Sequence, residues 1–187
     1  MPDRSVTNLQ DLIFYQYSKQ IARSAFQVPD GTTAKGQHYG FIKKTFRDLK
    51  NGVKKWSDIT REDWQFADSE KKCIYCGSTT NLQREHIVRK SLSINERCAN
   101  CPHIQEIHNQ VWACEDCNSK KGTLGVYEFY QKMDPGNPKF YDLVPSLLEK
   151  KYLKTIFRCH ECAGTLSAQD LDGDGKTTVL DIDFIIH

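Results

Sequence analysis

The stretch HNQVWACEDCNSKKG, residues 108–122, joins a strand-like piece, a Cys-x-x-Cys pair and the start of a helix. Its first part, NQVWAC, is typical of a short strand, and DCNSKKG follows as the start of a short helix. Upstream, KKCIYCGS (71–78) and LQREHIV (82–88) are further strand-like pieces separated by turns. From Cys73 to Cys114, the sequence therefore predicts short strand-like pieces and turns in place of the helical patterns that precede them, and helices are predicted again in TLGVYEFYQKM (123–133) and LVPSLLEKKYLKTIF (143–157).

Every cysteine of the chain belongs to a Cys-x-x-Cys pair. The pairs are Cys73 with Cys76, Cys98 with Cys101, Cys114 with Cys117, and Cys159 with Cys162. Two thiolates at this spacing can reach one tetrahedral zinc ion from a tight turn, and in a reducing compartment such pairs are metal ligands far more often than disulfides. Four pairs with no cysteine left over predict two structural zinc sites of four cysteines each.

Glu85 and His86 lie between the pairs at 73/76 and 114/117, and Asn118 directly follows the second pair. If these two pairs share one zinc ion, the chain between them closes into a loop that can bring Glu85, His86 and Asn118 to one side. A carboxylate and an amide oxygen favour a hard cation such as Mg²⁺ or Mn²⁺. A neutral histidine beside them can take a proton from water at physiological pH. A metal, a base and nearby lysines suit phosphodiester hydrolysis.

Three segments, CIYCG, EHIVRKSL and HNQVWACEDCNSKKG, resemble the HNH endonuclease family over about residues 73–122. The ββα-metal fold of that family is often stapled by a zinc ion held by four cysteines. The HNH modules of RNA-guided nucleases share the opening seen here at residues 85–88 and the nine-residue interval between Asn109 and Asn118. Two positions depart from the pattern: Arg89 stands where many members have proline, and Asn118 stands where histidine is common.

The resemblance implies a role for each group of this site. His86 would be the general base that activates water, while Glu85 and Asn118 would bind the catalytic Mg²⁺ or Mn²⁺. Asn109 would brace the loop carrying His86 by hydrogen bonding to its backbone. The implied reaction is one-metal hydrolysis, in which water attacks phosphorus in line and the metal stabilises the charge on the phosphate and the leaving 3′ oxygen.

The second zinc ion is expected to bind the two remaining pairs, Cys98 with Cys101 and Cys159 with Cys162. This site would dock the C-terminal segment onto the insertion within the nuclease loop. Histidines near these pairs are alternative ligands that could replace a thiolate, namely His103, His108 and His160.

The tail DLDGDGKTTVLD, residues 170–181, has the spacing of an EF-hand calcium loop. Its expected ligands are Asp170, Asp172, Asp174, the carbonyl of Lys176, and Asp181. Gly175 takes the sharp-turn position, and Asp181 replaces the usual bidentate Glu, so the tail resembles a dockerin-like or single EF-hand-like loop. Solvation of the acidic turn without a metal is the alternative.

Charge is unevenly distributed along the chain. Amphipathic helices are predicted over residues 7–26 and 37–50, and a short one over 60–70. From residue 35 to 55, seven cations oppose one acid, a sum of +6, whereas from 159 to the end six acids oppose one lysine, a sum of −5. A basic face suggests a polyanionic partner, and solvated surface is the alternative. The expected nucleic-acid contacts are Arg84, Arg89, Lys120, Lys121, Lys43, Arg47, Lys50 and Lys54.

We therefore predict an α+β protein with a zinc-stapled ββα-metal (HNH) core. The expected segments are an N-terminal helical segment (1–70), the nuclease core with its four-cysteine zinc site (71–132), and a C-terminal helix with the second zinc half-site and the EF-hand-like loop (133–187). The expected cofactors are two structural zinc ions, catalytic Mg²⁺ or Mn²⁺, and structural Ca²⁺.

The predicted function is metal-dependent endonuclease activity on double-stranded DNA, by a monomer or a homodimer. The alternative is a non-catalytic, zinc-dependent DNA- or RNA-binding protein. The chain is 39% hydrophobic and 27% charged. It has no apolar run near the roughly 18 residues that span a bilayer, and no cationic start followed by an apolar stretch. We expect a globular protein of the cytoplasm without a membrane span.

Overall fold

The computed structural model describes residues 4–26, 36–55, 67, 69–91 and 102–186. The helices are α1 (Leu9–Phe26), α2 (Gln37–Lys50), α4 (Glu115–Lys121), α5 (Val126–Met133), α6 (Ser146–Ala163) and α7 (Leu180–Asp183). The strands are β1 (Leu82–His86) and β2 (Gln110–Cys114), and short 3-10 turns are η3 (Pro102–Ile104), η4 (Ile107–Asn109), η5 (Phe140–Leu143) and η6 (Phe184–Ile186). The fold is mixed, mainly helical with a small two-stranded sheet, which agrees with the predicted α+β class.

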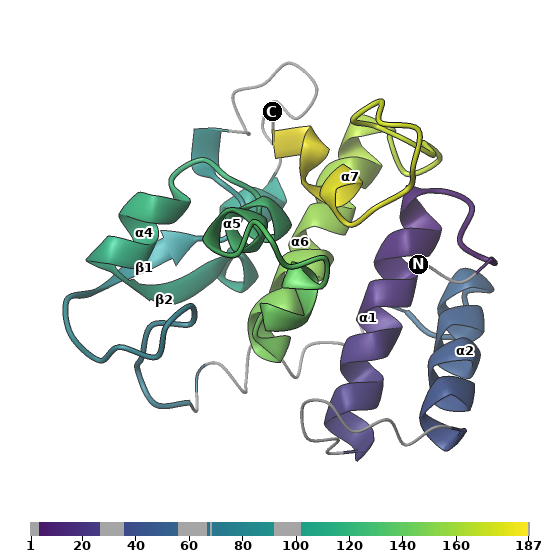
Figure 1. The fold of residues 1–187 in the computed structure, drawn as a ribbon, viewed down its shortest axis with the longest axis horizontal. Coiled ribbons are helices and arrows are strands. Elements are labelled where there is room, and N and C mark those ends of the chain that lie inside the picture. Colours follow the sequence, from purple (N-terminus) through teal and green to yellow (C-terminus); the bar gives the residue numbers. More distant parts are fainter. Residues whose placement is uncertain (1–3, 27–35, 56–66, 68, 92–101, 187) are drawn as a thin grey trace.

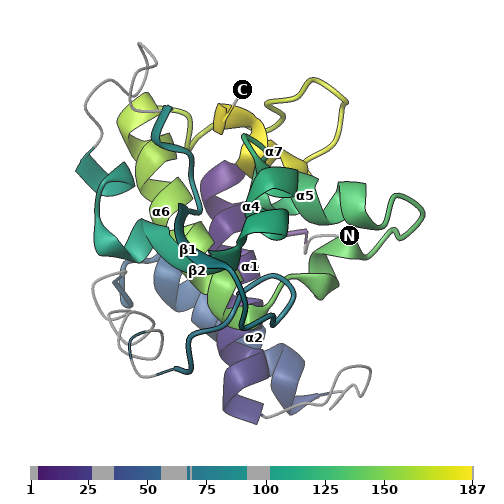
Figure 2. The same cartoon turned by 90° about the vertical axis from the view of Figure 1, so that its left-hand side faces the viewer.

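Helix α6 runs through the middle of the molecule (Figure 1). On one side it packs against α1, which in turn packs against α2. On the other side it contacts η3 and η4, which lead into β2. The sheet and α4 therefore lie at one end of the view in Figure 1 and α2 lies at the other. Figure 2 faces the end with the sheet, so α2 is among the more distant parts in that view.

Helix α1 is buried on more than one face because α2 and α6 both pack against it. Of the apolar positions at helical spacing, four are buried (Leu9, Leu12, Ile13 and Tyr17), Ile21 is half-buried and Ala25 is exposed. Several polar side chains are buried as well: Asp11, Gln16, Ser18 and Gln20. The buried polar groups need partners. Asp11 accepts hydrogen bonds from Thr7 and Lys50, and the Ser18 hydroxyl donates to the carbonyl of Phe14.

Strands β1 and β2 pair antiparallel, in a register that runs from Leu82 opposite Cys114 to His86 opposite Gln110. Side chains alternate between the two faces of a strand. Glu85 and its partner Val111 are accordingly buried, while the neighbouring Arg84 is exposed. One face of the sheet thus packs on the core and the other faces outward. Helix α4 begins directly after β2.

The segment KKCIYCGS, predicted as strand-like, is a turn, and that prediction is wrong. The amide of Gly77 donates to the carbonyl of Cys73, and the amide of Cys73 donates to the carbonyl of Ser78. Gly77 has φ of +78°, a value that suits glycine because it has no Cβ. The turn directs both cysteines of the pair to one side, which an extended strand cannot do. The short helix predicted over 60–70 falls almost entirely outside the described residues.

One hydrophobic core takes residues from all three segments expected from the sequence. Leu12 of α1, Val111 of β2 and Ile156 of α6 belong to the same cluster of buried side chains. Aromatic packing joins α1 to α6 directly, with the rings of Phe14 and Phe157 stacked at 5.4 Å between centroids. Among the helices in the described part of the chain, none combines the length and the apolar character needed to cross a bilayer.

Candidate metal centre and active site

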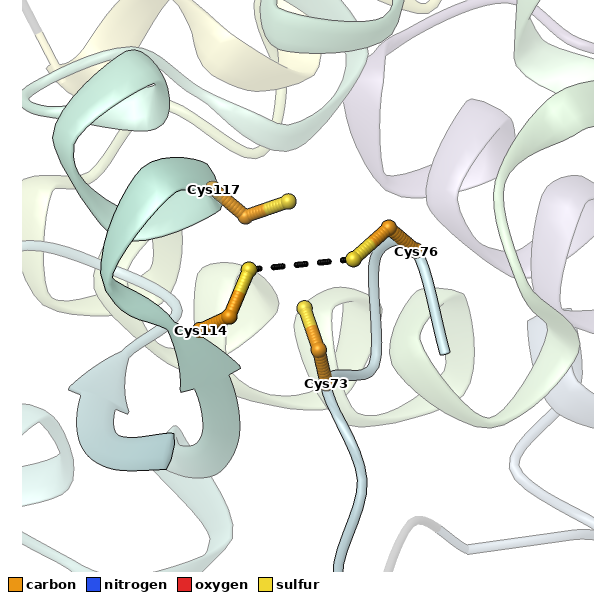
Figure 3. A group of neighbouring side chains, drawn as sticks. All are labelled: Cys73, Cys76, Cys114 and Cys117. Carbon is orange, nitrogen blue, oxygen red and sulfur yellow. Dashed lines mark hydrogen bonds between the residues drawn. The ribbon is translucent and has the colours of Figure 1, made fainter. Parts of the chain in front are cut away.

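Four cysteines from two separate parts of the chain come together beside the sheet (Figure 3). Cys73 and Cys76 belong to the turn before β1, Cys114 ends β2, and Cys117 lies in the first turn of α4. Their Sγ atoms all lie within 4.8 Å of one another, and those of Cys76 and Cys114 are 3.7 Å apart. This cluster can hold a metal ion such as zinc, because four thiolates at this range can form a tetrahedral site.

The surroundings of the cluster favour ionisation of one thiol and oppose ionisation of another. Burial opposes ionisation of Cys73, but backbone hydrogen bonds from Cys114, Cys76 and Tyr75 outweigh it and lower the pKa of the thiol to about 7. Burial and the neighbouring sulfurs raise the pKa of Cys117. Four thiolates this close repel one another, so a bound cation is what would let all four ionise. The residues present therefore fit a zinc ion.

Glu85 is a buried carboxylate with two partners, and both lie in or just after a Cys-x-x-Cys pair. Lys121, at the end of α4, places Nζ 3.0 Å from Oε1 of Glu85, and the Tyr75 hydroxyl donates to the same oxygen over 3.1 Å. Burial raises the pKa of Glu85, and Lys121 and Tyr75 oppose that rise. The segments that carry the two cysteine pairs therefore also hold the carboxylate of Glu85 in position. Sequence reasoning missed Tyr75, because only its place inside Cys-x-x-Cys could have indicated it.

Two buried polar atoms at the end of β1 have no hydrogen-bond partner among the described residues: Oε2 of Glu85 and Nε2 of His86. An unsatisfied buried polar group costs about 1–3 kcal/mol, so each atom needs a group that this part of the chain does not supply. Burial, and then the charge of Lys90, lower the pKa of His86, which keeps its imidazole neutral at pH 7. An acceptor oxygen and a neutral base are thereby adjacent in sequence.

Asn109 makes the backbone contacts that the resemblance implied. Its side-chain oxygen accepts from the amide of Val88 at 2.8 Å, and its side-chain nitrogen donates to the carbonyls of Val88 and Ile104, both at 2.8 Å. The carbonyl of Asn109 also accepts from the amide of Ile87. Asn109 therefore fixes the two residues after His86. Its role in catalysis stays a prediction.

Asn118 is half-buried on α4, and among the described residues no side-chain hydrogen bond joins it to Glu85 or His86. The structure thus brings α4 to the sheet, and binding of Mg²⁺ or Mn²⁺ by Glu85 and Asn118 stays a prediction. The neighbouring lysines differ: Lys120 is exposed, whereas Lys121 is 1% exposed and ion-paired. Of the two lysines, only Lys120 is exposed and could contact a phosphate.

The second predicted zinc site is described in part. Cys98 and Cys101 lie outside the described residues, while Cys159 is buried and Cys162 exposed, both near the end of α6. Burial lowers the pKa of His160 to about 4. Its Nε2 lies 2.9 Å from the carbonyl of Ile182, and its Nδ1 lies 2.8 Å from the Thr165 hydroxyl. Both ring nitrogens of this alternative ligand are therefore occupied.

The other alternative ligands share one acid. Oxygens of Glu106 lie 3.1 Å from Nδ1 of His103 and 3.0 Å from Nδ1 of His108. Arg158 of α6 contacts the same group, with its guanidinium 3.1 Å from His103 and 3.6 Å from Glu106. These contacts hold the segment after residue 101 against α6, next to Cys159.

The acidic tail forms a closed turn. Carboxylate oxygens of Asp170, Asp172 and Asp174 lie within 4.8 Å of one another. Asp181, the expected final ligand, is 1% exposed, and its carboxylate accepts from the amides of Leu171 (2.7 Å) and Thr178 (2.6 Å). Asp181 thus closes the loop through the backbone. Calcium binding, by these acids and the carbonyl of Lys176, stays a prediction.

The basic face expected on α2 is partly neutralised by its own neighbours. Its candidate contacts are Lys43, Arg47, Lys50 and Lys54. Lys50 pairs with Asp11 at 2.7 Å, and Lys54 lies 4.0 Å from Asp48. Lys43 lies over a tyrosine ring of the same helix, 4.8 Å from its centroid. Arg84 is exposed and Arg89 is half-buried, both near His86 in sequence.

Comparisons with family models, with curated proteins and with solved structures find no match to this chain. The arrangement of the four cysteines, Glu85, His86 and Asn109 is therefore the basis for assigning a function.

Proposed function

We propose that the chain is a metal-dependent HNH endonuclease that hydrolyses phosphodiester bonds of double-stranded DNA. The observation that carries the proposal is the pair of buried atoms without partners in the described residues, Oε2 of Glu85 and Nε2 of His86. The order of strand, strand and helix, with a cysteine pair at each end, supports it.

Each residue has a defined task in this proposal. His86, neutral at pH 7, takes a proton from water at Nε2. Asn109 holds the backbone after His86 so that the imidazole keeps its orientation. Oε2 of Glu85 and the amide oxygen of Asn118 are the groups that would hold Mg²⁺ or Mn²⁺, which would supply charge neutralisation at the scissile phosphate.

A non-catalytic, zinc-dependent nucleic-acid-binding protein is the competing function. Two observations favour it. Lys121 already neutralises Glu85. Alternation along β1 also directs Glu85 inward and His86 to the more exposed face. In a nuclease, Oε2 of Glu85 would have to bind the metal while Lys121 contacts Oε1 of the same carboxylate.

The proposal extends to the two remaining metals. The contact of His103 with Arg158, the residue before Cys159, holds the segment after residue 101 against α6, which supports a second zinc ion shared by the pairs at 98/101 and 159/162. The gathered carboxylates of the tail support Ca²⁺ as a structural ion.

Nicking of supercoiled plasmid in Mg²⁺ or Mn²⁺ tests the proposal. We expect His86→Ala to lower the nicking rate by about 10²- to 10⁴-fold, the usual contribution of general-base catalysis. His38→Ala, which removes a histidine of α2, is the matched control and should keep the wild-type rate. Equal melting temperature and zinc content of the two variants would exclude misfolding. Plasmid binding without nicking in any divalent ion would establish the competing function.

A further inference from the structure

The outward face of the sheet carries an aromatic ring contacted by two cations. Arg84 of β1 lies opposite Trp112 of β2, with its guanidinium carbon 4.4 Å from the ring centroid. Lys71, just before the cysteine turn, places Nζ 5.4 Å from the same ring. Both cations are exposed and Trp112 is half-buried. We call these three residues the sheet-face group.

The sheet-face group lies beside His86. Residues two apart on a strand share a face, so Arg84 and His86 point to the same side of β1. The burial along the strand agrees, since Arg84 is exposed, Glu85 buried and His86 half-buried. Arg84 and the ring that it contacts therefore lie on the same face of the sheet as His86.

The charges of this group are open to an outside partner. Neither Arg84 nor Lys71 forms an ion pair with an acid in the part of the chain that the structure describes. The cations of α2 differ, because Asp11 and Asp48 already pair with several of them. The indole ring also restricts the motion of both side chains, which lowers the entropy lost on binding.

We infer that the nucleic-acid backbone lies across the outward face of the sheet, with Arg84 and Lys71 contacting phosphates on one side of His86 and Trp112 holding both cations in place. This interaction surface deepens the proposed function, on which it rests for the role of His86. It also locates binding at the sheet, away from the basic face of α2, which lies at the other end of the molecule in Figure 1.

Binding of a labelled DNA duplex to the full-length, zinc-loaded protein tests this surface. All variants carry His86→Ala, so that binding is measured without cleavage. Arg84→Glu with Lys71→Glu should weaken binding by about tenfold or more and should reduce the slope of log K against log salt by about two, because two phosphate contacts are lost. Arg84→Lys with Lys71→Arg keeps both charges and should keep the slope.

The matched control reverses two cations on α2. Lys43→Glu with Arg47→Glu changes the net charge by the same amount, yet should leave the salt slope unchanged. A loss of slope in this control as large as in the sheet-face variant, or an unchanged slope in the latter, would overturn the inference. Protein that binds through the sheet-face group but never nicks plasmid would retain the surface and refute the nuclease.

Discussion

The helical part built from α1 and α6 and the cysteine-stapled part built from β1, β2 and α4 are held together by different means. In the first, 18-residue helices bury large apolar side chains, and Leu148, Leu153 and Ile156 of α6 are fully covered. The second has two five-residue strands, and a two-stranded sheet is marginal by itself. A zinc ion at the four cysteines would therefore add to the stability that apolar burial gives this part, and the candidate site residues lie in it.

The two parts also treat buried acids differently. In the stapled part Glu85 meets the ammonium of Lys121. In the helical part, Glu149 is bound by the Tyr127 hydroxyl at 2.7 Å and by the side-chain amide of Gln20. Burial raises the pKa of Glu149 to about 7, although the hydrogen bond from Tyr127 opposes the rise. Burial raises the pKa of both acids, but Lys121 opposes the rise at Glu85, whereas the pKa of Glu149 reaches about 7.

Zinc removal should produce the largest difference in stability between the two parts. Structural zinc contributes apparent free energies of about 10–16 kcal/mol in small domains, so a chelator or Cys117→Ser should abolish hydrogen-exchange protection in β1, β2 and α4. Helices α1 and α6 should keep most of their protection, because apolar packing holds them. Hydrogen exchange resolved by peptide measures both at once.

Ser119→Ala is the control for this experiment, since Ser119 is an exposed residue of α4 outside the four-cysteine cluster. It should leave protection in β1 and α4 intact. Protection of the stapled part that survives complete zinc removal would contradict the comparison.

Glu149→Gln should remove a pH dependence that belongs to the helical part. Because the folded pKa, about 7, is above the ordinary value of 4.5, this acid stabilises the fold fully below about pH 4.5, and that contribution is lost as pH rises toward 7. The variant should therefore be more stable than wild type at pH 8, by up to about 3 kcal/mol, with little difference at pH 4.5. Denaturant melts across this range measure it.

Asp142→Asn is the matched control, because Asp142 is an exposed acid paired with Arg23 and should change stability by about 1 kcal/mol or less. Equal stability of Glu149→Gln and wild type from pH 4.5 to 8 would show that Glu149 is ionised in the fold throughout.

Calcium binding should change the stability of the fold less than zinc removal or Glu149→Gln does. At about ten times its dissociation constant, an ion that binds only the folded chain adds about 1.4 kcal/mol. Zinc-loaded protein prepared without calcium should gain a few degrees of melting temperature when Ca²⁺ is added. Asp170→Asn with Asp172→Asn should abolish the gain. No gain in the wild-type protein would leave the tail as a solvated acidic turn.

Local patterns accounted for most elements of the fold. The amphipathic pattern over residues 37–50 became α2 with those limits, and the pieces around His86 and Trp112 became the paired strands, because alternation and helical spacing are properties of neighbouring residues. The strand predicted for KKCIYCGS was wrong because its two cysteines turn toward one cluster, and this requirement outweighs strand propensity.

The residue types of the candidate site could be predicted from the sequence, but the side chains that contact those residues could not. Cysteine spacing indicated the cluster at 73, 76, 114 and 117. The ion pair between Glu85 and Lys121 could not be foreseen, because it depends on how far α4 extends past Cys117 over the sheet. The ring of Trp112 beneath Arg84 follows from the strand register, which only the folded structure fixes.

Chemical rescue of His86 tests the central claim most directly. His86→Gly removes the imidazole at the end of β1 and leaves a space that free imidazole can enter. We predict that this variant does not nick plasmid in Mg²⁺ and that added imidazole restores nicking, with a rate that follows the concentration of its neutral form. Nicking by His86→Gly at the wild-type rate without imidazole would contradict the assignment of His86 as the base.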